Sequence, residues 1–344
     1  MGFASGLVSQ LGWGVESTAG TAVTATKFQP HKSEGIKLDV NRQQGDGLFA
    51  STNAFDLASR HVLTTKDVSG DFEVELTDKG LGTLWRAAVG STTTPTLVTT
   101  GVYQAVFQPG DQKSAGSSLT VQVGRPQTDG TVKPFTYNGV KIKGFEFGGA
   151  IDELLTLKLD IDAWNETTST ALATASYPTG AIQFAGTQLA VNIGGTASTT
   201  GSVVSVTGST ALSGVKSVKV KGENPLASDR YYANASGVKA EQLINAPRKY
   251  EVEIEADFVS QTAMYDLYVA GTTTALTLTW TGATVIAGGQ YPTLEVIIPA
   301  AKITKAEVNA DGPDVLGQKV TLTVVSDGTN APFQIRTISA DAAL

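Results

Sequence analysis

The chain has 344 residues, a net charge of −7 and no cysteine, which excludes disulfides and thiolate metal sites. The acidic balance argues against a DNA reader, because phosphate binding requires a patch of lysine and arginine. No apolar run approaches the ~18 residues that cross a membrane. Residues 1–25 lack the basic start and solid apolar block of a signal peptide, so we expect neither membrane insertion nor secretion.

Abundant glycine and threonine, with short alternating runs between turn residues, predict a mainly β protein. The chain opens with GWGVESTAGTAVTATKFQP (12–30), which is too polar for a signal peptide and too irregular for a helix. A polar stretch follows over 41–60. In the first half, alternation predicts strands over 35–40, 71–76, 103–108, 118–124, 139–149 and 154–164.

One helix is predicted in this half, over 78–90. Its apolar residues recur at the spacing of a single helix face: Leu81, Leu84, Trp85 and Ala88. Gly90 supplies the stop signal.

The second half repeats this order of elements. A long polar loop is predicted over 223–237, and a short helix over 260–271 has Ala263, Leu267 and Ala270 on one face and ends at Gly271. The predicted strands are 215–222, 249–258, 275–280, 294–310 and 318–327.

An offset of 161 residues aligns the two halves and places Ile142 on Ile303, Glu146 on Glu307 and Leu159 on Val320. Such internal repetition predicts two tandem copies of one mainly β (α+β) unit, each with one flanking helix. We expect the units over 31–164 and 215–344, joined by a Thr/Ser/Gly-rich connector over 165–214 that holds a strand or two.

Catalytic motifs are missing from the sequence. No serine has the flanking glycines of a nucleophile elbow, and there is no phosphate-binding P-loop. His31 and His61 are too few for most histidine-based metal sites. Asp160 and Asp162 share a strand face and could do acid–base work, but a solvated face explains them more simply. We therefore expect no enzyme, no metal and no cofactor.

Two strands carry stacked acidic residues on one face. They are Asp71, Glu73 and Glu75 in the first half, and Glu251, Glu253, Glu255 and Asp257 in the second. One interpretation is a solvated sheet face paired with lysines such as Lys219 and Lys221. The other is a surface selected to be negative, which a polyanion passes without sticking.

Four segments resemble tail tube (major tail) proteins of long-tailed, non-contractile phages (siphophages). They are the opening 12–30, DVSGDFEVELTDKGLGTLWRAAVG (67–90), the run from VQVGRP to LDIDAW (121–164) and ASYPTG (175–180). The resemblance implies β-sandwich or barrel units that assemble into rings. Stacked rings form a tube that conducts the genome, with inner sheets joined across subunits into one closed barrel.

The resemblance also implies roles for particular residues. Residues 1–30, with Trp13, Val15 and Phe28, become an N-terminal arm that reaches a neighbouring subunit and has little to bury in a single chain. The loops 41–60 and 223–237 become inter-ring contacts, with aromatic residues suited to burial at an interface: Phe49, Phe55, Tyr231 and Tyr232. The seven acidic residues above become lumen-facing.

Two units per chain favour a trimeric ring with pseudo-sixfold symmetry, and a hexameric ring is the alternative. The implied partners are further copies of the chain, a tape-measure protein, tail-end proteins and double-stranded DNA that passes without specific binding. The protein is expected in the virion after synthesis in the host cytoplasm. The alternatives are another self-assembling surface-layer or fibre subunit and, less favoured, a glycan-binding β-sandwich that uses Asp160, Asp162 and an exposed Trp164 or Trp280.

Overall fold

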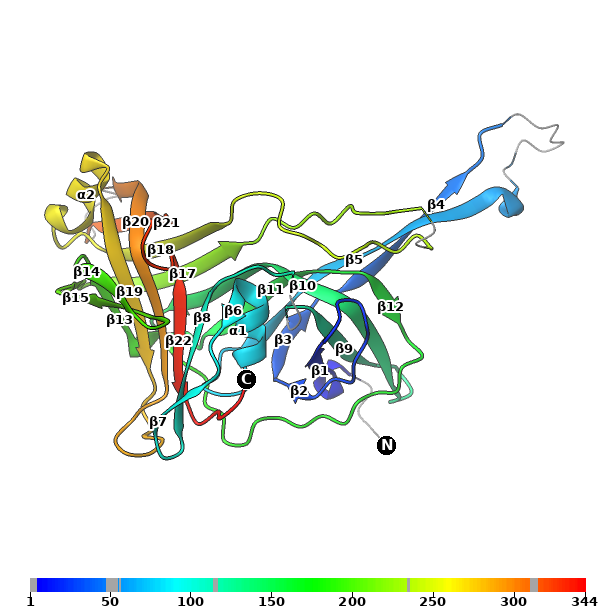
Figure 1. Cartoon of the computed structure of the whole chain (residues 1–344), viewed down its shortest axis with the longest axis horizontal. Helices are drawn as coiled ribbons and strands as arrows, with labels where there is room; N and C mark the ends of the chain where they lie inside the picture. The colour runs from blue at the N-terminus through cyan, green and yellow to red at the C-terminus, as the bar shows by residue number, and fades with distance from the viewer. Residues whose placement is uncertain (1–4, 48–54, 56, 114–116, 234–235, 310–314) are drawn as a thin grey trace.

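The computed structural model describes residues 5–47, 55, 57–113, 117–233, 236–309 and 315–344 (Figure 1). In this part of the chain the fold is mainly β with two α-helices, α1 (Gly82–Val89) and α2 (Gln261–Ala270), as the sequence predicts. Left-handed glycines, Gly90 with φ 107° and Gly271 with φ 64°, follow the two helices, because glycine adopts this conformation without a side-chain clash.

The strands fall into a first and a second set along the chain. The first set is β1 (Gln10–Val15), β2 (Lys27–Phe28), β3 (His31–Glu34), β4 (Lys37–Gln44), β5 (His61–Glu75), β6 (Gly90–Thr92), β7 (Thr96–Thr99), β8 (Val102–Pro109), β9 (Leu119–Pro126), β10 (Val132–Ala150), β11 (Thr156–Ala163) and β12 (Asn165–Thr167). The second set is β13 (Leu189–Ile193), β14 (Thr196–Thr200), β15 (Val203–Thr207), β16 (Thr210–Ala211), β17 (Val215–Glu223), β18 (Lys249–Asp257), β19 (Thr273–Thr281), β20 (Thr293–Asn309), β21 (Gly317–Val324) and β22 (Gln334–Ser339).

Register shifts in the strand pairing recur at equivalent positions of the two halves. β10 pairs with β11 with a register shift between Ile142 and Gly144, and β20 pairs with β21 with a shift between Ile303 and Lys305. The two shifts lie 161 residues apart, which is the offset seen in the sequence. Bulges are specific features that recur within families, so their repetition indicates two copies of one unit.

The two units join into one continuous antiparallel sheet. Its strand order is β4, β5, β11, β10, β17, β18, β21 and β20, and the β10–β17 pairing is the junction between the units. Among the described residues the pairings branch at β10 and β20 but do not return to their starting strand. The sheet therefore ends at β4 (with β3) on one side and at the C-terminal half of β20 on the other.

Further strands form a second layer over this sheet. β1, β2, β9 and β12 continue from the first half of β10, and β13, β16, β19, β22 and β8 continue from the first half of β20. One apolar core runs between the layers through both units. At its centre Phe147 lies 5.1 Å from Trp85 of α1 and 6.1 Å from Trp280 of β19, between ring centroids.

The structure corrects the expected N-terminal arm. β1 pairs along its length with β9 of the same chain, Trp13 is fully buried and donates its indole N–H to Thr83, Phe28 is buried, and Val15 packs against the core. The glycines of this stretch permit close packing. A Cβ on Gly12 would lie 2.4 Å from the Phe28 ring, so glycine is needed for this close approach.

The expected unit boundaries also differ from the observed pairings. β13 and β16, in the expected connector, belong to the sheet of the second unit, whereas β14 and β15 form a separate hairpin. β8 of the first half pairs with β22 near the C-terminal end. The apolar face of α2 consists of Met264 and Leu267, and Ala270 is exposed, so that helix face was predicted only in part.

β4 and β5 continue into a hairpin that projects from the body of the fold (Figure 1). Residues 224–233 and 236–248 of the second unit run beside its base (Figure 1). Tyr231 donates its hydroxyl to the carbonyl of Lys66, and the Lys239 ammonium, with no exposed surface, binds Asp67 and lies 2.8 Å from the buried Asp162 carboxylate. This buried ion pair ties the second unit onto the first.

We expect Lys239→Met to lower the free energy of unfolding by about 3–5 kcal/mol, because it leaves the buried Asp162 charge without a cationic partner and with only the Gln242 amide donating to it. Lys219→Met, which removes a half-exposed lysine 3.7 Å from Glu146, should cost at most about 1 kcal/mol. Urea unfolding curves measure both. Adding Asp162→Leu to Lys239→Met should recover part of the loss, and a wild-type midpoint for Lys239→Met alone would contradict this role.

Candidate functional site

The outer face of the eight-stranded sheet is covered by charged side chains. Alternation directs the apolar residues of β5 and β18 into the core, where Phe72, Val74, Val252 and Ile254 are fully buried. The acidic residues of the same strands therefore lie on the opposite face. They are the seven predicted from the sequence: Asp71, Glu73, Glu75, Glu251, Glu253, Glu255 and Asp257.

Lysines lie beside six of these carboxylates. The ion pairs are Lys158–Asp71 (3.2 Å), Lys32–Glu73 (3.4 Å), Lys249–Glu251 (3.0 Å), Lys221–Glu253 (2.9 Å), Lys319–Glu255 (3.7 Å) and Lys216–Asp257 (2.6 Å). The hydrogen bond from Lys221 lowers the pKa of Glu253, and the hydrogen bond to Asp71 raises the pKa of Lys158. This geometry agrees with the first interpretation of the acidic strands, in which lysines pair with the carboxylates. The face therefore carries interspersed positive and negative side chains.

The two edges of this sheet resemble each other in chemistry. On β4, the Lys37 ammonium lies 3.1 Å from the Asp39 carboxylate, and the half-buried Leu38 packs against the core between them. On β20, Lys305 lies 2.8 Å from Glu307, with the half-buried Ala306 between them. Each edge thus presents one lysine, one carboxylate and one apolar side chain beside strand backbone that no described strand pairs.

The predicted contact loops have different surroundings. Phe55 is 75% exposed in the hairpin, and Phe49 lies outside the described residues. Tyr231 is bound within the chain through Lys66. Tyr232 is exposed, and the Arg230 guanidinium lies 5.7 Å from its ring centroid. Only part of the predicted loop surface is therefore available to another molecule.

The residues of the glycan-binding alternative do not form an open site. Asp160 is exposed on the charged face, whereas Asp162 is buried against Lys239. Trp280 is buried in the core, which contradicts its expected exposure. Trp164 is half-buried and donates its indole N–H to Gln242 at 2.8 Å. These four side chains serve packing or solvation in this chain.

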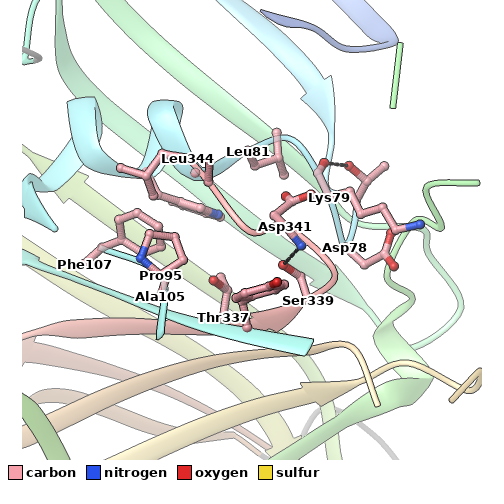
Figure 2. Close-up of a pocket in the computed structure, with 15 residues that line it drawn as sticks. Asp78, Lys79, Leu81, Pro95, Ala105, Phe107, Thr337, Ser339, Asp341 and Leu344 are labelled. Atoms are coloured by element: carbon pink, nitrogen blue, oxygen red, sulfur yellow. Dashed lines mark hydrogen bonds between the residues drawn. The ribbon is translucent and has the colours of Figure 1, made fainter. Parts of the chain in front are cut away.

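A small hollow lies beside the start of α1, where the C-terminal residues fold back (Figure 2). The Asp341 carboxylate accepts a hydrogen bond from the Gly80 amide at 2.7 Å, and Leu344 packs close to Gly82. The hollow measures about 30 Å³, the volume of roughly one water molecule in the liquid. It is a packing feature of the C-terminal segment and too small for an organic ligand.

Within the described ranges, no group of three or more His, Asp or Glu side chains is arranged to hold a metal ion. Neither helix of these ranges is long and apolar enough to cross a membrane.

Sequence reasoning missed the two charged edges and the buried Lys239. The edge signal was present in the short runs KLD (37–39) and KAE (305–307), where a lysine and a carboxylate flank an apolar residue. Lys239 lies in a polar loop without periodicity, and its partner Asp162 is distant in sequence, so no local pattern marks this pair.

Comparison with known proteins agrees with this architecture. A family model described as phage tail tube protein matches residues 6–324, a range that includes every described strand of both units except β22. No curated protein matches the chain. Because the family match covers most of the sequence, the chain belongs to the phage tail tube protein family, whose members are structural proteins of the virion.

Proposed function

We propose that this chain is the ring-forming subunit of a phage tail tube, with three copies in each ring. One observation carries the proposal: the β10–β17 pairing already joins two like half-sheets within the chain, and the joined sheet ends in two unpaired edges. Unpaired edges favour pairing with another chain, and a closed ring removes them.

Three chains supply six half-sheets, which is the basis for a trimer with pseudo-sixfold symmetry. A hexamer of chains is the alternative and would contain twice as many half-sheets. In both rings the sheet is continuous, and its charged face lines the bore while the second layer and the helices lie outside. Family membership favours this function over a surface-layer or fibre subunit.

The charged face suits a bore that DNA traverses. DNA attracts unpaired lysine and arginine through counterion release. Here carboxylates lie beside the lysines, as in the Lys221–Glu253 pair, so the surface offers phosphates little net positive charge. Passing DNA would therefore meet a hydrated, charged wall without strong adsorption.

The β4–β5 hairpin and the neighbouring residues 224–233 and 236–248 are assigned to contacts between stacked rings. The support is the projection of the hairpin from the fold and its exposed apolar residues, among them Leu57 and Val62. Phe55 and Tyr232 belong to this contact surface. Ends of the stack would bind tail-end proteins, and the bore would hold a tape-measure protein before DNA enters. Synthesis takes place in the host cytoplasm, and the role is structural rather than catalytic.

Native mass spectrometry and negative-stain microscopy of the purified full chain test the proposal. We expect rings of three chains with an open bore, because three chains with two half-sheets each supply the six half-sheets of the closed sheet. Rings of six chains would contradict the trimer and support the hexameric ring. A monomer at all accessible concentrations, or solid fibres without a bore, would contradict the proposed function.

The triple variant Glu251→Lys, Glu253→Lys, Glu255→Lys tests the lining of the bore. We expect tubes to form and DNA ejection from assembled particles to slow, because the variant adds unpaired lysines along one strand facing phosphates. The delay should shrink as salt rises. A matched control places three lysines at exposed acidic positions outside this face: Asp129, Asp152 and Asp266. Equal ejection rates for variant, control and wild type would refute the placement of this face in the bore.

A further inference from the structure

We infer that β20 of one copy pairs with β4 of the next copy in a single register, with Lys37 opposite Glu307, Leu38 opposite Ala306 and Asp39 opposite Lys305. The inference rests on the proposed ring and deepens it, because it names the residues that select the partner edge. It uses the internal junction between the units as a guide to the junction between copies.

The internal junction fixes a register between like strands. In the β10–β17 pairing, Gly144 lies opposite Glu223, Phe145 opposite Gly222 and Glu146 opposite Lys221. β20 corresponds to β10 with the 161-residue offset of the shared bulge. Lys305, Ala306 and Glu307 therefore occupy the positions of Gly144, Phe145 and Glu146.

β4 corresponds to β17 in the same way. Each is the outer neighbour of an equivalent strand, β5 or β18. Both pairings contain the same irregularity: β3 shifts register between His31 and Ser33 against β5, and β17 shifts between Val215 and Ser217 against β18. The resulting offset of 184 residues places Lys37, Leu38 and Asp39 at the positions of Lys221, Gly222 and Glu223.

The apolar pair at the two junctions supports this correspondence. Inside the chain the large Phe145 covers Gly222, and a Cβ on Gly222 would lie 2.2 Å from the phenylalanine ring. Between copies the small Ala306 would face the larger Leu38. A large residue opposes a small one in both cases, with the order reversed. Ala306 and Leu38 are each only half-buried in the single chain, so pairing would complete their burial.

The charges discriminate against slipped registers. In the inferred register each lysine faces a carboxylate across the strands, and directly opposite pairs of unlike charge stabilise a sheet. A slip by two residues in one direction places Lys37 opposite Lys305, and a slip in the other direction places Asp39 opposite Glu307. A slip by one residue turns every side chain to the wrong face. Only one register thus satisfies both the charges and the apolar pair.

Reversing one edge tests the charge pairing. Lys37→Glu with Asp39→Lys keeps the net charge and an ion pair within β4 but creates two like-charge contacts across the junction. We expect a roughly tenfold rise in the protein concentration needed for half-maximal ring formation, measured by sedimentation. Lys305→Glu with Glu307→Lys should have the same effect, and the fourfold variant that combines both reversals should return close to wild type. A fourfold variant that assembles no better than either double variant would overturn the inferred register.

Engineered cysteines test the register directly, since the chain has no native cysteine. Lys37→Cys with Glu307→Cys should give disulfide-linked chains up to the size of one ring under mild oxidation, because opposite residues on paired strands lie within disulfide reach. Within one chain these positions lie at opposite edges of the sheet, so they cannot react with each other. The control Lys37→Cys with Lys305→Cys is displaced by two residues, a separation of roughly 7–8 Å that disfavours bridging.

The two failures are distinguishable. If the wild type forms rings but the variant Lys37→Cys with Glu307→Cys gives no covalent oligomer, or the displaced control links equally well, the register is wrong and the proposed function stands. If the wild type forms no ring, the proposed function fails first.

Discussion

The β10–β17 pairing is the constraint on which this architecture depends. It converts two separate units into one eight-stranded sheet with a shared core, in which Phe145 fits over Gly222 and Phe147 joins Trp85 to Trp280. Backbone pairing satisfies the donors and acceptors of both inner edges, because each residue contributes one N–H and one C=O. The backbone groups of the two outer edges have no strand partner among the described residues, and the proposed ring would pair them.

Several parts of this fold were predictable from local sequence. α1 followed from apolar residues at helical spacing and a terminal glycine, and its predicted face, including Leu84 and Trp85, is buried. The central strands followed from strict alternation. The duplication followed from the 161-residue offset, which the paired bulges at Ile142 and Ile303 reproduce. These signals are local or repeated, so one sequence suffices to read them.

The remaining parts depend on contacts between distant residues. The resemblance implied an arm over residues 1–30, yet this stretch lies within the fold, where Gly12 and Gly14 make room for Phe28 and for the backbone of Thr24. The connector was predicted by its Thr/Ser/Gly composition, although β13 pairs with β19, which lies far along the chain. The acidic strands left two interpretations open, a lysine-paired face and a negative surface. The choice between them depends on lysines of other strands, such as Lys158 beside Asp71 and Lys221 beside Glu253, whose positions follow from the assembled sheet. The composition of a segment does not predict which distant residues pack against it.

In the proposed ring, the charged edges would keep a single chain soluble and selective before it meets the next copy. Lys37 and Asp39 on one edge, and Lys305 and Glu307 on the other, neutralise each other along their own strands. Charged side chains on an edge strand discourage indiscriminate pairing, since a mismatched strand would bury them or place like charges together. The correct edge only exchanges one set of ion pairs for another. Covalent linkage of the two units would help as well, because half of the six junctions in the proposed trimeric ring are intramolecular and form on folding, at a high effective concentration. Three associations would then complete a closed sheet that separate units would need six to build.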